Sequence, residues 1–134
     1  MRILALVLLV LSFSQTLLSQ ETPKRIWFDT DIMMGLPERA PREIDDGVTL
    51  VMALAQDNIE IVGITLITEV DYGEKITNEI LERYAPERSI PVYKGSPDAD
   101  DLGTETDASK ALAEALKKEK MTVLALGPAT NVAT

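Results

Sequence analysis

Strand-like and helix-like segments alternate along this chain from residue 24 onward. Runs rich in branched and aromatic residues have the length of strands, and the stretches between them have the spacing of helices with one buried face. The expected strands are 25–28, 59–67, 90–93 and 121–126, and the expected helices are 46–55, 73–84 and 107–119. This order is typical of an α/β fold with an open, mostly parallel sheet flanked by helices.

Residues 1–19 are predicted to be a secretory signal peptide, with an uncleaved anchor as the alternative. Met1 and Arg2 form a short basic head, and polar residues interrupt the apolar run that follows before it reaches the length of a membrane span. We expect cleavage after Ser19 and export to the periplasm or the outside of the cell, with no membrane attachment afterwards. Residues 24–134 are then expected to form the amino-terminal part of a larger, truncated domain, because the sequence stops where a covering helix should follow the fourth strand.

The composition is that of one soluble globular domain, with 46% hydrophobic and 26% charged residues among 134. There is no cysteine, so the fold has no disulfide framework. The formal net charge of −9 becomes −10 when Arg2 is removed with the signal peptide. Such a surface repels phosphate backbones, which argues against nucleic acid as a partner. An exposed sheet edge would favour a homo-oligomer.

Four aspartates flank the connection between the first expected strand and the first expected helix. Asp29 and Asp31 end the strand, and Asp45 and Asp46 begin the helix. Like charges held this close repel one another, so a fold tolerates them only where a cation, water or donor groups stabilise them. A calcium ion, which takes oxygen ligands, is the simplest such partner.

Two further loops are expected to reach the same place. Thr68, Glu69 and Asp71 follow the second strand, and residues 126–128 follow the fourth. The carboxyl ends of parallel strands lie at one edge of the sheet, which is where ligands bind in such folds. Three separate loops therefore converge on one candidate site.

The motifs resemble those of the inosine-uridine preferring nucleoside hydrolase family. Asp29-Thr30-Asp31 followed by Ile44-Asp45-Asp46-Gly47 is similar to the family's amino-terminal signature. Residues 61–65, 90–95 and 125–133 are similar, in the same order, to its second strand, its third strand and its Gly-Pro-x-Thr-Asn turn. The resemblance implies an open α/β sheet and an enzyme that cleaves the N-glycosidic bond of ribonucleosides to ribose and free base with a bound Ca²⁺ ion.

The resemblance also implies a role for individual residues. Asp31 matches the aspartate that binds calcium and acts as general base on the attacking water, and Asp46 matches a bidentate calcium ligand. Asp45 matches a contact to a ribose hydroxyl, and Leu126 falls on the position whose backbone carbonyl binds the ion. Asp29 is either a further ligand or a group that orients Asp31 from behind.

These roles agree with the chemistry of the reaction. Breaking a glycosidic C–N bond builds positive charge on the sugar ring, which clustered carboxylates stabilise. Water bound to a metal ion is also easier to deprotonate, and a carboxylate that touches the water can accept its proton.

An insertion separates the two aspartate pairs, because residues 32–43 stand where the family usually has little more than a proline and a glycine. It brings Arg39 and Arg42 close in sequence to the carboxylates, so the choice of substrate stays open. Met33 and Met34 are expected either to line an apolar pocket for a base or simply to pack.

Two other departures concern substrate and turnover. Glu69 stands nearest to the position where the family has an asparagine that contacts the ribose, so it is our candidate for a substrate contact. The chain has no histidine, and the family's carboxyl-terminal half, with a further aspartate ligand and often a histidine acid, is missing from the sequence. We therefore expect weak metal binding and little turnover from these residues alone.

Alternative interpretations remain at several positions. Asp45 or Asp46 could be a helix cap, and Thr130-Asn131 fits a helix cap better than a catalytic pair. A strand ending in Asp29-Thr30-Asp31 is also how haloacid dehalogenase-like phosphatases with an aspartate nucleophile begin. A third hypothesis is a non-catalytic or decayed homologue that binds calcium or a nucleoside.

Overall fold

The computed structural model describes residues 22–35, 40 and 42–134. The predicted signal peptide and Arg39 lie outside these residues. Within the described ranges, no helix combines the length and the apolar character that crossing a membrane requires.

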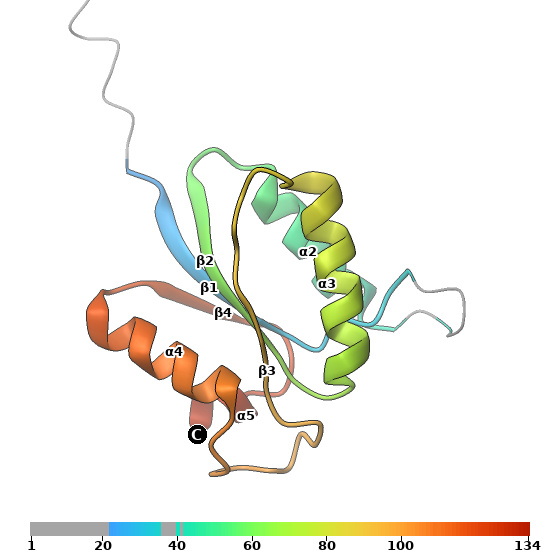
Figure 1. Ribbon diagram of the computed structural model, residues 1–134, viewed down its shortest axis with the longest axis vertical. Helices are drawn as coiled ribbons and strands as arrows, with labels where there is room; N and C mark the ends of the chain where they lie inside the picture. The colour runs from blue at the N-terminus through green and yellow to red at the C-terminus, as the bar shows by residue number, and fades with distance from the viewer. Residues whose placement is uncertain (1–21, 36–39, 41) are drawn as a thin grey trace, which may run out of the picture.

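In the described part of the chain, four parallel strands form one sheet in the order β3-β2-β1-β4 (Figure 1). Their bounds are Lys24–Thr30 for β1, Ile59–Leu66 for β2, Val92–Lys94 for β3 and Thr122–Ala125 for β4. The predicted open α/β sheet is confirmed. Because all strands run in one direction, the loops after β1, β2 and β4 leave the sheet at the same edge, as expected.

Helices cover both faces of the sheet (Figure 1). Two of them, α2 (Ile44–Leu54) and α3 (Val70–Tyr84), lie on one face, and α4 (Asp107–Lys118) and the short α5 (Thr130–Ala133) lie on the other. Both α2 and α3 begin earlier than predicted, directly after a residue with a left-handed backbone, Glu43 before α2 and Glu69 before α3. The left-handed residue turns the chain into the helix at once, which leaves no room for a longer loop.

The core between the sheet and α2 and α3 fixes the two central strands. Phe28 of β1, Leu50 of α2, and Ile64 and Leu66 of β2 are completely buried there. Burying side chains of this size contributes about 1.5–3 kcal/mol each. The carboxyl end of β1, where Asp29 and Asp31 lie, is therefore held by a well-packed core.

Trp27 occupies the opposite face of β1 and begins a polar network. Its ring lies over Gly63, where a Cβ atom would come within 2.5 Å of the ring, and stacks on Tyr93 with 5.9 Å between centroids. Its indole N–H donates a 3.1 Å hydrogen bond to the hydroxyl of Thr65. Thr65 in turn donates to Asp29, so the network runs from the sheet face to the candidate site.

Candidate active site

Asp29 is completely buried at the end of β1. Its Oδ1 atom accepts hydrogen bonds from the Thr65 hydroxyl (2.5 Å) and from the Asn131 side-chain amide (2.9 Å). Its Oδ2 atom has no hydrogen-bond partner among the described residues. Burial raises the pKa of Asp29, and the two hydrogen bonds oppose that rise. A nucleophile must reach its substrate, so this buried side chain does not support the phosphatase hypothesis.

Asp31 follows β1 and is only partly buried. The loop after β4 lies directly against it, because a Cβ atom on Gly127 would stand 2.8 Å from Asp31 Oδ1. The N–H of Leu126, in the same loop, donates a 2.9 Å hydrogen bond to the carbonyl of Asp29. The structure therefore brings Asp31 and the Leu126 loop together, as the sequence predicted.

Asp46 approaches the same edge from α2. It is almost completely buried, and its carboxylate accepts hydrogen bonds from the Thr30 hydroxyl and from the backbone N–H of Asp31. These contacts face the sheet, and α2 has no side-chain cap. The N-cap residue of α2 is Glu43, so Asp45 and Asp46 lie inside the first turn and neither is the cap that the sequence suggested; Asp45 is exposed there.

Burial, with a smaller contribution from neighbouring charges, raises the pKa of the carboxylates at this edge. Burial is the main cause that raises the pKa of Asp31 to about 6, and the charges of Asp46 and Glu43 add to it. Burial also raises the pKa of Asp46, against the hydrogen bonds from Thr30 and Asp31. The ionised form of these carboxylates is therefore disfavoured in the metal-free protein, as expected for a site that a cation completes.

Backbone strain gathers at the same edge. The three described non-glycine residues with a left-handed backbone are Glu43, Thr68 and Glu69, with φ angles of 46°, 55° and 21°. Such conformations cost on the order of 1–3 kcal/mol each and persist where the surroundings fix them. The N–H of Thr68 is tied to the carbonyl of Ser96 at 2.9 Å. Glu69 itself is exposed directly before α3.

The residues fit an oxygen-binding cation in part. Asp31, Asp46 and the backbone carbonyl of Leu126 are hard oxygen donors of the kind calcium prefers. Among the described residues, however, no three acidic, histidine or cysteine side chains converge closely enough to hold a metal ion. Calcium takes roughly six to eight oxygens, so these residues account for only part of its shell.

A comparison with models of protein families matches residues 26–134 to the inosine-uridine preferring nucleoside hydrolases. The chain belongs to this family. It is therefore a nucleoside hydrolase by resemblance, and the match includes every strand and helix described above except the first two residues of β1. A search of curated proteins finds no match.

Asn131 of this hydrolase has a role that the sequence did not predict. The residue that caps α5 is Ala129, and Asn131 lies inside the helix with its side chain buried. Its amide donates to Asp29 and to the carbonyl of Leu66. The helix-cap interpretation of Thr130-Asn131 is therefore wrong for Asn131. The pairing with Asp29 spans 102 positions in the sequence, and no local pattern reveals it.

The two described ends of the insertion lie side by side. The N–H of Arg42 donates to the carbonyl of Met33 at 2.7 Å, in an isolated antiparallel bridge. Met33 is buried, which supports simple packing for this residue. Arg42 is exposed.

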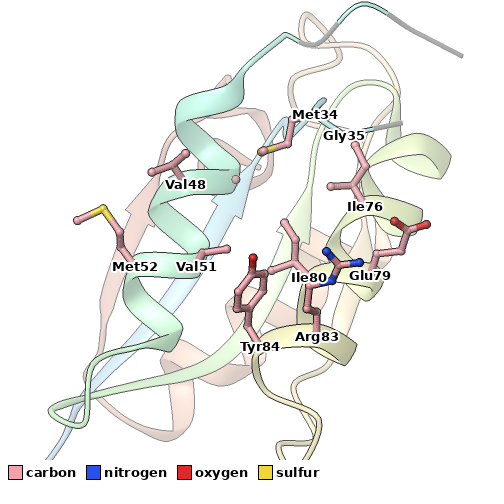
Figure 2. Close-up of a pocket in the computed structure, with 11 residues that line it drawn as sticks. Met34, Gly35, Val48, Val51, Met52, Ile76, Glu79, Ile80, Arg83 and Tyr84 are labelled. Atoms are coloured by element: carbon pink, nitrogen blue, oxygen red, sulfur yellow. The ribbon is translucent and has the colours of Figure 1, made fainter. Parts of the chain in front are cut away.

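Met34 lines an apolar groove of about 420 Å³ between α2 and α3. Figure 2 shows Val51 of α2 across the groove from Tyr84 and Arg83 of α3, with Met34 near one end. None of the predicted site residues lines it. The groove is therefore separate from the carboxylate edge.

Proposed function

We propose that this nucleoside hydrolase cleaves the N-glycosidic bond of ribonucleosides in a calcium-dependent reaction that gives ribose and a free base. The observation that carries the proposal is the joint position of Asp31 and Asp46, linked through the Asp31 backbone N–H, against the loop of Gly127. Family membership supports the nucleoside as substrate, and the paired carboxylates support the metal.

Asp31, Asp46 and the backbone carbonyl of Leu126 would hold the ion. A bound calcium ion makes a coordinated water easier to deprotonate. Asp31 would supply the base, because a carboxylate that touches the coordinated water can accept its proton. Asp29 would support the site from behind Asp31 and not contact the substrate, because it is completely buried and its Oδ1 atom accepts hydrogen bonds from Thr65 and Asn131.

The exposed residues of the edge would contact the sugar. Asp45, in the first turn of α2, and Glu69, just before α3, are both exposed. Carboxylates at both places can accept hydrogen bonds from ribose hydroxyls and stabilise positive charge that develops on the ring. We also propose that the protein is exported, on the sequence of residues 1–19 alone.

The test is the release of free base from a panel of purine and pyrimidine ribonucleosides, separated by chromatography after long incubation with Ca²⁺ or with a chelator. We expect slow release that requires Ca²⁺ and that Asp31→Asn abolishes. Asp57→Asn removes the same charge from an exposed loop position and should release base at the wild-type rate. Release that survives both the chelator and Asp31→Asn would contradict the proposal.

A second candidate is a homologue that binds calcium or a nucleoside without turnover. The observation in its favour is that the described residues supply no group of three side-chain ligands, because a nucleoside can bind without the firmly held ion that hydrolysis would require. Saturable ribonucleoside binding, measured by calorimetry, with no base released over days would favour this candidate over the hydrolase.

A further inference from the structure

The side chain of Asn131 lies where three strand ends meet. It is 4% exposed, and its Nδ2 atom donates to Asp29 Oδ1 at the end of β1 (2.9 Å) and to the carbonyl of Leu66 at the end of β2 (3.0 Å). Both donor hydrogens of the amide are used, and both partners belong to central strands. The short helix α5 is thereby bonded to β1 and β2, the two central strands of the sheet.

Gly95 makes room for this amide beside β3. A Cβ atom on Gly95 would stand 2.1 Å from Asn131 Oδ1 and 2.4 Å from the carbonyl oxygen of Leu66. The N–H of Gly95 also donates to that carbonyl, at 2.9 Å. The Leu66 oxygen thus receives a backbone and a side-chain donor, so the Asn131 amide is confined by the ends of β1, β2 and β3.

The loop before Asn131 is held to Asp29 at both of its ends. At its start the N–H of Leu126 donates to the Asp29 carbonyl, and at its end the Asn131 amide donates to the Asp29 carboxylate. Gly127, between these two attachments, lies against Asp31. Two attachments to one residue determine both how near the loop comes to β1 and how it is turned.

We propose that Asn131 is a positioning residue for the metal site. By bonding to both Asp29 and Leu66 it holds the loop of Leu126 and Gly127 against Asp31, the carboxylate that would bind the ion. This inference rests on the proposed function, since the bound ion is its purpose. A residue that served folding alone would change stability and leave the affinity of the folded protein for metal as it was.

The test uses Asn131→Asp, which keeps the side-chain volume, removes the donor and sets a second carboxyl group beside Asp29. Asn78→Asp makes the same chemical change at an exposed position of α3 and is the matched control. Two quantities are measured on each folded protein: the calcium affinity by calorimetry, and the rate of amide hydrogen exchange at Leu126, whose N–H is bonded to Asp29. The amide of Ile64, bonded to Pro91 at the other side of the sheet, is the internal reference.

We expect Asn131→Asp to lower calcium affinity at least tenfold and to speed exchange at Leu126 at least tenfold relative to Ile64, with neither effect in Asn78→Asp. The double variant Asp29→Asn/Asn131→Asp restores a donor and acceptor with their roles exchanged, and should recover at least threefold of each loss. If Asn131→Asp does not fold, Asn131→Ala and the double variant provide the same two measurements.

Unchanged affinity together with unchanged relative exchange in a folded variant would overturn the proposal. Equal acceleration at Leu126 and Ile64 would overturn it too, because it would mean a general loss of stability. If the wild-type protein binds no calcium, the proposed function fails, and exchange at Leu126 still decides whether Asn131 positions the loop.

Discussion

Replacing Gly127 with alanine should disturb Asp31 directly. The added Cβ atom would stand 2.8 Å from Asp31 Oδ1, 2.9 Å from the Asp31 backbone nitrogen and 2.9 Å from Ile67 Cγ2. Carbon contacts are comfortable at about 3.5–4.0 Å, so the neighbours must yield by roughly 0.6 Å or more. The Asp31 nitrogen is backbone and cannot rotate away. The strain therefore falls on the segment that carries the predicted catalytic carboxylate.

The magnitude follows from this overlap. Gly127 is not among the residues with positive φ, so alanine suits its backbone and the cost is steric alone. Inserting a methyl group into a packed site typically costs about 1–3 kcal/mol. If Asp31 is a metal ligand, its displacement should lower calcium affinity by about ten- to a hundredfold, the usual effect of disturbing the support of a ligand.

The assay combines urea unfolding with calcium calorimetry, and Gly103→Ala is the matched control. Gly103 has a φ of 82° and nothing within 4 Å of an added Cβ atom. Alanine there costs about 1–2 kcal/mol through its left-handed backbone and touches no site residue. Both variants should lose stability, and only Gly127→Ala should also lose calcium affinity.

Two results would refute this reasoning. If Gly127→Ala is as stable as the wild type, the loop after β4 does not lie against Asp31. If both variants lose calcium affinity equally, the loss comes from general instability and not from the displacement of a ligand.

Three further predictions test the surroundings of the site. Gly95→Ala should lower the urea midpoint and weaken calcium binding, because its Cβ atom would collide with Asn131 Oδ1; wild-type behaviour would mean that the amide is not confined there. Trp27→Phe should cost more than the roughly 1 kcal/mol of the lost hydrogen bond to Thr65, because the smaller ring also leaves a cavity over Gly63, and Trp27→Phe/Thr65→Val should cost less than the sum of the two single losses. Asp31 has a pKa of about 6 in the fold and about 3.9 when unfolded, so its protonation stabilises the fold at low pH and this contribution is lost as pH rises through 6. The metal-free protein should therefore lose more stability between pH 5 and pH 7.5 than Asp31→Asn does, and equal losses in urea titrations would contradict the raised pKa.

The fold was predictable because its pattern is local. Each buried strand and each helix with one apolar face can be recognised over a dozen residues, and the parallel arrangement follows from their alternation. The edge that carries Asp31, Asp46 and Leu126 follows from the same rule. Chain order did not give the strand order, and the helix starts were missed because Glu43 and Glu69 adopt left-handed conformations that their residue type does not signal.

The supports of the site were not predictable in this way. Thr30 and Thr65 look like ordinary strand residues in the sequence, and Asn131 looks like a helix cap, yet all three bond to buried carboxylates. These partners are 16, 36 and 102 positions from the aspartates they contact. Such pairs form only when the strands and helices come together in the folded protein, so a local sequence pattern cannot reveal them.

Calcium titration of the wild-type chain beside Asp46→Asn tests the central claim most directly. Asparagine keeps the size of the side chain and one oxygen that can accept a hydrogen bond, so the fold should persist while one ligand charge is lost. We predict calcium binding by the wild type that weakens at least tenfold in Asp46→Asn and is unchanged in Asp57→Asn. Equal binding by all three proteins, or no binding by the wild type, would show that Asp46 does not hold a calcium ion at this edge of the sheet.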